Sequence, residues 1–191
     1  RLYAIVKTGV SITMPVFQGI ERDADTILAI DCGKGRSVID SASISGIKIK
    51  PSDVSLSKGL KFGYANGSFQ KMTHAESCDL CEEYKEDLEN IKLTLPKSAP
   101  FITTSPVKVA VANAIKEGVS IDLAKEFCKA LVTGEYNEPI FVNAVRLRSR
   151  LITTKHSGST RVIAYNMTYN TLMKTSQGIE VKRLIEGRMA K

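Results

Sequence analysis

The Asn-Gly dipeptide at 66–67 is the feature that most restricts how this chain can fold. Both central residues of a two-residue type I′ turn need positive φ angles, and Asn-Gly adopts them more readily than other pairs. The flanking segments 60–64 and 68–72 each contain apolar and aromatic side chains. We therefore predict a β-hairpin around this turn, in which Tyr64 and Phe69 face each other across the two strands.

Other segments of the N-terminal half have the composition or the alternation of strands. Residues 1–10 and 26–30 are apolar and β-favouring, while 43–50 and 88–95 alternate between apolar and polar side chains. The sequence thus predicts a strand-rich N-terminal half. An acidic run interrupts this pattern and is typical of an exposed helix or loop. Its acids are Glu76, Asp79, Glu82, Glu83, Glu86, Asp87 and Glu89.

Two helices with well-marked ends are predicted near 105–133. In the first, Ser105 suits the N-cap, Pro106 suits the first helical position, and a glycine follows the last turn. In the second, Ser120 suits the N-cap and Gly134 suits the end. The short link between them predicts an antiparallel helical hairpin.

Residues 140–154 allow two interpretations. As a strand, they place three arginines on one face and apolar side chains on the other. As a helix, they place Ala144, Leu147 and Leu151 in one stripe, with the arginines spread over the opposite side. Because 160–172 is rich in Val, Ile, Tyr and Thr, it suits a second strand of a hairpin, and we favour the strand.

Together these segments predict an α+β fold with a strand-rich N-terminal half, a helical hairpin near 105–133 and further β structure at the C-terminal end. A chain of 191 residues that is 43% hydrophobic can bury its own core, so we expect 1–191 to form a single domain. The chain begins with Arg1 rather than Met, which indicates a fragment or a processed product. No apolar run reaches the roughly 20 residues that a membrane span needs.

The positive charge of the chain is concentrated in its C-terminal third. Residues 139–191 hold ten basic side chains but only Glu180 and Glu186 as acids, a net charge of +8 that exceeds the +7 of the whole chain. Such an excess suits nucleic-acid phosphates, an anionic membrane or an acidic protein surface. The alternative, weighed about equally, is a solvated basic surface that keeps the protein in solution.

Basic and aromatic side chains in this third predict a nucleic-acid site. Arginine binds phosphate through two parallel hydrogen bonds, and aromatic rings stack on unpaired bases, so the combination favours single-stranded nucleic acid. The alternative is that the arginines pair with the acidic run, within the fold or between copies. The predicted site comprises Arg146, Arg148, Arg150, Lys155, His156, Arg161, Tyr165 and Tyr169.

A weaker pattern suggests a metal site at His74, Cys78 and Cys81. The Cys-x-x-Cys spacing brings two thiolates within reach of one Zn²⁺, and the histidine is near enough to add a third ligand. A structural zinc site needs a fourth ligand, which would have to come from a distant residue. Two unligated thiols are the more common outcome for such a pair, and we expect no disulfide between them.

The sequence thus favours a non-enzymatic binding or assembly protein of the coat, matrix or ribonucleoprotein type. Its expected partners are nucleic acid or an acidic protein surface, together with further copies of itself. No pairing of nucleophile and base suggests an enzyme. The alternative is a small metal-dependent enzyme or a zinc-stabilised domain. Four unevenly spaced cysteines indicate a reducing, intracellular compartment.

Overall fold

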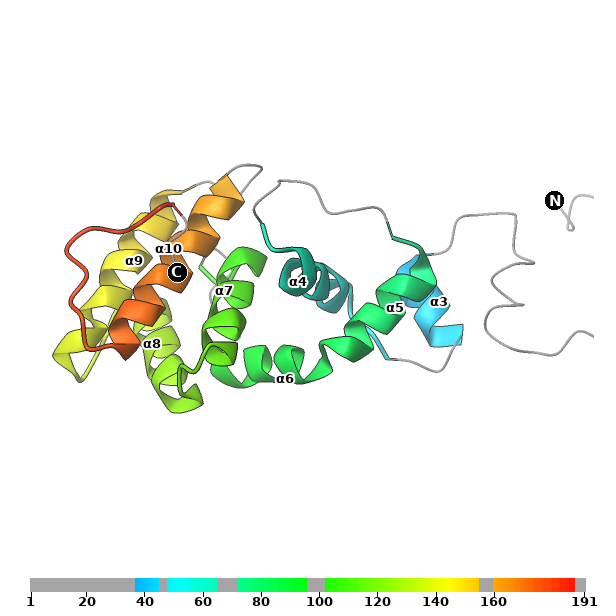
Figure 1. Ribbon diagram of the computed structural model, residues 1–191, viewed down its shortest axis with the longest axis horizontal. Coiled ribbons are helices and arrows are strands. Elements are labelled where there is room, and N and C mark those ends of the chain that lie inside the picture. The colour runs from blue at the N-terminus through cyan, green and yellow to red at the C-terminus, as the bar shows by residue number, and fades with distance from the viewer. Residues whose placement is uncertain (1–36, 45–47, 65–71, 96–101, 155–159, 188–191) are drawn as a thin grey trace, which may run out of the picture. The chain divides into compact units, whose positions relative to one another are not determined.

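The structure is a computed structural model of the chain (Figure 1). It describes residues 37–44, 48–64, 72–95, 102–154 and 160–187. All of them belong to the unit Ser37–Lys191.

The described residues form helices and contain no strand. In chain order the elements are α3 (Val38–Ile44), α4 (Pro51–Phe62), α5 (His74–Glu83), α6 (Lys85–Thr94), α7 (Ser105–Lys116), α8 (Ile121–Thr133), the 3₁₀ turn η1 (Pro139–Phe141), α9 (Val142–Thr153) and α10 (Thr160–Ser176). The predicted α+β fold is therefore wrong for this part of the chain. The β-favouring segments 1–10 and 26–30 lie outside the described residues.

The predicted β structure at the C-terminal end is replaced by α9 and α10. In α9, Leu147 and Leu151 are fully buried one helical turn apart, and the arginines spread around the outer side. In α10 the buried positions recur every three or four residues, the period of a helix. They are Ala164, Met167, Thr168, Asn170, Thr171, Leu172 and Thr175. Three of them are threonines, which a strand prediction based on alternating apolar and polar residues places on the exposed face.

These threonines fit a buried helical face because two of their hydroxyl groups bond within the helix. Thr168 Oγ1 donates to the Ala164 carbonyl at 2.8 Å, and Thr175 Oγ1 donates to the Thr171 carbonyl at 2.8 Å. Burial of a hydroxyl costs little when it is hydrogen-bonded. Tertiary burial therefore overrides the strand preference of the β-branched side chains.

Two predicted strands of the N-terminal half are also helical. Helix α4 extends to Phe62, where the predicted hairpin had its first strand, and the Asn-Gly turn itself lies outside the described residues. Residues 88–95 lie mostly in α6, whose buried residues include Leu88 and Ile91, whereas Leu93 is 64% exposed. The alternation in this segment was therefore misleading, because a helical face uses positions three and four apart.

The two capped helices are confirmed as α7 and α8. The first begins one residue earlier than predicted, with Thr104 as its N-cap and Pro106 in the second position. The second begins as predicted, because Ser120 Oγ accepts a hydrogen bond from the Leu123 amide at 3.2 Å. It ends at Gly134, which has the left-handed φ of 82° that favours glycine. The acidic run is also helical and spans α5 and α6.

Helix α7 is central to the packing of the described residues. It packs against α10, α4 and α6 (Figure 1), and its Val107, Val109 and Val111 are fully buried. Helix α8 contributes Phe127 and Leu131 to the same hydrophobic core and packs against α9 and α6. Among the described helices, none has the length and apolar character needed to cross a bilayer.

Candidate nucleic-acid interface

Two of the three predicted arginines on α9 are held in ion pairs by the segment that follows α10. Arg146 contacts Glu180 at 2.8 Å and donates a hydrogen bond to the Val181 carbonyl at 2.8 Å. Arg150 contacts Glu186 at 3.0 Å. These partners are the only two acids of the basic third, and they do not belong to the acidic run at 76–89.

The third arginine points in another direction, as expected for the middle of a helical i, i+2, i+4 series. Arg148 lies beside Gly134 at the end of α8, where an added Cβ would be 3.5 Å from Arg148 Nε. The predicted strip of three parallel arginines therefore does not exist, because it depended on the two-residue period of a strand.

The two tyrosines of the predicted site face the protein. Their rings stack on each other, with centroids 6.1 Å apart and an angle of 9° between the planes. The Tyr165 hydroxyl accepts a hydrogen bond from Asn113 at 2.9 Å, and the Tyr169 hydroxyl donates to Glu117 at 2.5 Å. They thus fasten α10 to α7, and the predicted stacking on bases loses its geometric basis.

Arg161, at the start of α10, has a different environment. It is exposed, and no carboxylate of the described residues lies within ion-pair distance of it. It lines a cavity of about 330 Å³ together with residues of α4, α7 and the segments beside them. We call this the Arg161 cavity. Its lining residues are Ser55, Tyr64, Thr103, Thr104, Ser105, Pro106 and Arg161.

The close packing of α4 on α7 positions Tyr64 in this cavity. Gly59 allows the approach, since an added Cβ would lie 2.9 Å from the Tyr64 hydroxyl oxygen and 2.9 Å from Val109 Cγ2. Burial raises the pKa of Tyr64 to about 12, although the nearby Arg161 cation and the Ser105 hydroxyl partly offset the rise. The Tyr64 hydroxyl is therefore protonated at neutral pH and keeps its capacity to donate a hydrogen bond.

The Arg161 cavity gathers hydroxyl groups that the sequence analysis did not assign to a site. Ser105 is the first residue of α7, and Thr103 and Thr104 directly precede it, so that a run of hydroxyl side chains comes before Pro106. This run was the available signal, but only Ser105 of it entered the prediction, as an N-cap. The predicted site residues at 155–156 lie outside the described residues.

The residues of the predicted metal site lie in α5, and both thiols are buried. Burial raises the pKa of Cys78 and of Cys81, which disfavours the thiolate that binds Zn²⁺. Cys81 Sγ also accepts a hydrogen bond from Ser57 at 3.7 Å. Among the described residues, no three His, Cys, Asp or Glu side chains, His74 included, are grouped as metal ligands. Zinc binding therefore stays a prediction that metal analysis tests.

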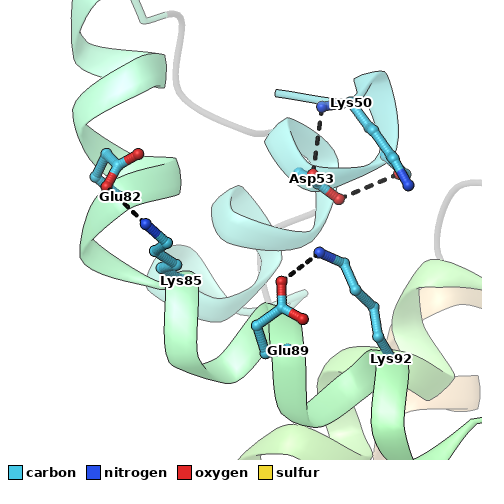
Figure 2. A network of polar contacts seen from close by, with 7 residues as sticks. Lys50, Asp53, Glu82, Lys85, Glu89 and Lys92 are labelled. Atoms are coloured by element: carbon cyan, nitrogen blue, oxygen red, sulfur yellow. Dashed lines mark hydrogen bonds and ion pairs between the residues drawn. The ribbon is translucent and has the colours of Figure 1, made fainter. Parts of the chain in front are cut away.

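A second concave surface, of about 460 Å³, is lined by residues from α4, α5 and α6 and from the segment before α4. Figure 2 shows how its charged groups pair: Lys85 lies 3.7 Å from Glu82, and Lys92 lies 2.6 Å from Glu89. The Lys92 hydrogen bond lowers the pKa of Glu89 and raises that of Lys92. The buried Asp53 carboxylate accepts a hydrogen bond from the backbone amide of Lys50, the N-cap residue of the same helix, α4. This balance of charge makes the surface less suited to an anion than the Arg161 cavity.

Comparisons of the chain with known protein families, curated proteins and solved structures find no significant match.

Proposed function

We propose that the chain is a non-enzymatic binding protein that contacts nucleic-acid phosphates at the Arg161 cavity. The observation that carries the proposal is an exposed arginine, without a carboxylate in ion-pair distance among the described residues, beside a recess lined by hydroxyl side chains. Of the three predicted site residues in α10, Arg161 has an exposed side chain that a ligand can reach, whereas the hydroxyls of Tyr165 and Tyr169 bond to α7 and the residue after it.

The chemistry of the cavity matches that of a phosphate group. A guanidinium donates two parallel hydrogen bonds to phosphate oxygens, and neutral hydroxyls donate further ones. Thr104 Oγ1 is buried and has no hydrogen-bond partner among the described residues, so it reaches a bound oxygen only if the Thr104 side chain rotates toward the cavity. A volume of about 330 Å³ corresponds to roughly ten water molecules at ~30 Å³ each, enough room for a phosphate and part of its sugar.

Charge farther from the cavity supports the same ligand class. The ion pairs of Arg146 and Arg150 use both acids of the basic third, and the remaining basic residues of that third keep its charge excess. Lys182 and Arg183 are exposed on the segment after α10. An uneven field of this kind speeds the association of a polyanion.

The shape of the site favours single-stranded nucleic acid over a duplex. A flexible strand can turn one phosphate into a recess, whereas a duplex presents its phosphates along a stiff convex surface. The preference therefore follows from the recess and no longer from base stacking.

The test compares Arg161→Gln with Arg150→Gln in binding to a single-stranded oligonucleotide at several salt concentrations. We expect Arg161→Gln to weaken binding about tenfold, because a hydrogen-bonded charge pair contributes about 1.5 kcal/mol. The slope of log K against log salt should fall by about 0.7, since one fewer counterion is released from a single strand. Arg150→Gln is the matched control, because its side chain is already held by Glu186.

Two results would contradict the proposal. One is that the unaltered protein has no affinity for single-stranded RNA or DNA at low salt. The other is that both variants weaken binding equally, which would indicate a diffuse charge effect and not a site. Competition by inorganic phosphate, lost in Arg161→Gln, would separate the cavity from the general field.

A further inference from the structure

Residues 179–187 form an extended segment, here called the strap, that turns back beside α9 and α10 (Figure 1). The side chain of Asn143 in α9 makes two hydrogen bonds to the backbone of the strap. Its Nδ2 donates to the Ile179 carbonyl at 2.9 Å, and its Oδ1 accepts from the Val181 amide at 2.8 Å. On α10, Asn170 Nδ2 donates to the carbonyls of Ile185 and Gly187 at 3.1 and 2.9 Å. Side-chain amides thus take the place of a neighbouring β-strand.

Further contacts from both helices complete this recognition. Asn166 Nδ2 donates to the Glu186 carbonyl at 2.9 Å. Arg146 and Arg150 bind the strap through its Val181 carbonyl and its two glutamates. We call the surface formed by Asn143, Arg146 and Arg150 of α9 with Asn166 and Asn170 of α10 the strap groove.

The strap buries less apolar surface than the helices do. Val181 is 3% exposed and Leu184 is partly buried against the hydrophobic core, but Ile179 is 47% exposed and the four charged strap residues are exposed. A segment with two anchoring apolar side chains and polar contacts at the surface opens at a lower cost than the core. When it opens, the amides of Asn143 and Asn170 lose their partners in the strap, and the strap of another copy carries the same backbone groups.

A tight turn returns the strap toward α10. The Gly178 amide donates to the Thr175 carbonyl at 3.0 Å, and the Ile179 amide donates to the Lys174 carbonyl at 2.9 Å. Gly178 has a φ of 72°, in the left-handed region where other residues are strained. If this turn straightens, the strap leaves its own groove while α10 stays intact.

We propose that the strap groove binds the strap of a second copy of this chain, so that copies assemble by exchanging straps. The intramolecular complex supports this choice of partner, because the strap of another copy would make the same bonds. Exchange in both directions closes a dimer, whereas exchange in one direction builds an open chain. The inference does not depend on the Arg161 cavity, and variants of Arg161 should leave assembly unchanged.

The first test uses two glycines in equivalent turns. Gly118 follows α7 as Gly178 follows α10: its φ is 104°, its amide donates to the Ile115 carbonyl, and an added Cβ meets nothing within 4 Å at either position. Gly178→Ala strains only the closed strap, so we expect the dissociation constant of the assembly to fall at least about tenfold. Gly118→Ala strains monomer and assembly equally and should leave that constant unchanged. Sedimentation equilibrium over a range of protein concentrations measures both.

The second test is complementation between two variants that each lack one half of the contact. Val181→Asp has an intact groove but a strap that cannot fill it, while Asn143→Ala has an intact strap but a defective groove. Each should be monomeric alone, and a mixture should form a one-to-one heterodimer that native mass spectrometry detects. Asn170→Ala serves as the groove variant if the buried Asn143→Ala change unfolds the protein, which circular dichroism would reveal.

The proposal would be overturned by a monomer at every concentration for both the unaltered protein and Gly178→Ala. It would also be overturned if Gly118→Ala promoted assembly as strongly as Gly178→Ala. A mixture of folded complementary variants that stays monomeric would have the same meaning.

Discussion

Cys128 shows how strongly a single position depends on its surroundings. It lies in α8, fully buried in the hydrophobic core beside Phe127. Burial raises the pKa of the Cys128 thiol to about 12, because no charge or hydrogen bond offsets the loss of hydration. The thiol is therefore uncharged and unreactive in the folded protein, which suits a packing role and not a catalytic one.

The raised pKa predicts a loss of stability in alkaline solution. The folded state holds the Cys128 proton up to about pH 12, whereas the unfolded chain releases it near pH 9, so the free energy of unfolding falls as pH rises above 9. Between pH 8 and 10 this thiol accounts for a loss of about 1.4 kcal/mol. In Cys128→Ala, the decrease in the free energy of unfolding between pH 8 and 10, measured by urea denaturation, should be smaller by about 1.4 kcal/mol. This difference does not depend on the absolute stability of the variant. An unchanged pH dependence would contradict the assignment.

Among the elements, α8 has the clearest local boundaries. The Ser120 side chain accepts the Leu123 amide at its start, and Gly134 adopts the left-handed conformation at its end. Both features depend on residues within one turn of the helix end, so they form wherever the helix forms. This explains why its limits follow from the sequence.

We expect Ser120→Ala to lower the free energy of unfolding by about 1 kcal/mol, because the Leu123 amide loses its acceptor. Ser120→Asp should retain most of the stability, since a carboxylate accepts the same bond and interacts well with the helix dipole. Chemical denaturation of the three proteins measures the difference. Equal losses for both variants would show that the cap bond does not contribute.

The order of stability across the described part of the molecule follows from how each segment is buried. Helix α7 contacts α4, α6 and α10 and buries three valines completely. The strap buries Val181, packs Leu184 partly against the core and otherwise depends on polar contacts at the surface. We therefore expect α7 to open only when the whole unit unfolds, and the strap to open locally while the helices stay folded.

Native-state hydrogen exchange tests this order. The amides of Val109 and Val111 should exchange only by global unfolding, while the Val181 amide should exchange by local opening at least about 100-fold faster. Exchange of the Val181 amide as slow as that of α7 would show that the strap opens only with the core. It would also remove the low-cost opening on which strap exchange between copies depends.

Features that depend on short-range chemistry can be predicted from the sequence alone. The limits of α8 follow from its cap and its terminal glycine, those of α7 follow to within one residue from Pro106 and Gly118, and the basic excess of residues 139–191 follows from composition. Of the predicted nucleic-acid site, Arg161 keeps an available side chain, while Arg146 and Arg150 are bound within the fold.

In the segments with mixed preferences, the choice between helix and strand depends on tertiary packing. A threonine such as Thr168 is neither plainly apolar nor plainly polar, and burial of its hydroxyl is favoured here because the Ala164 carbonyl of the same helix accepts its hydrogen bond. The strap groove likewise joins Asn143 to Val181, 38 residues away along the chain. Such partners are set by packing, because a buried amide must find donors and acceptors wherever the fold brings them.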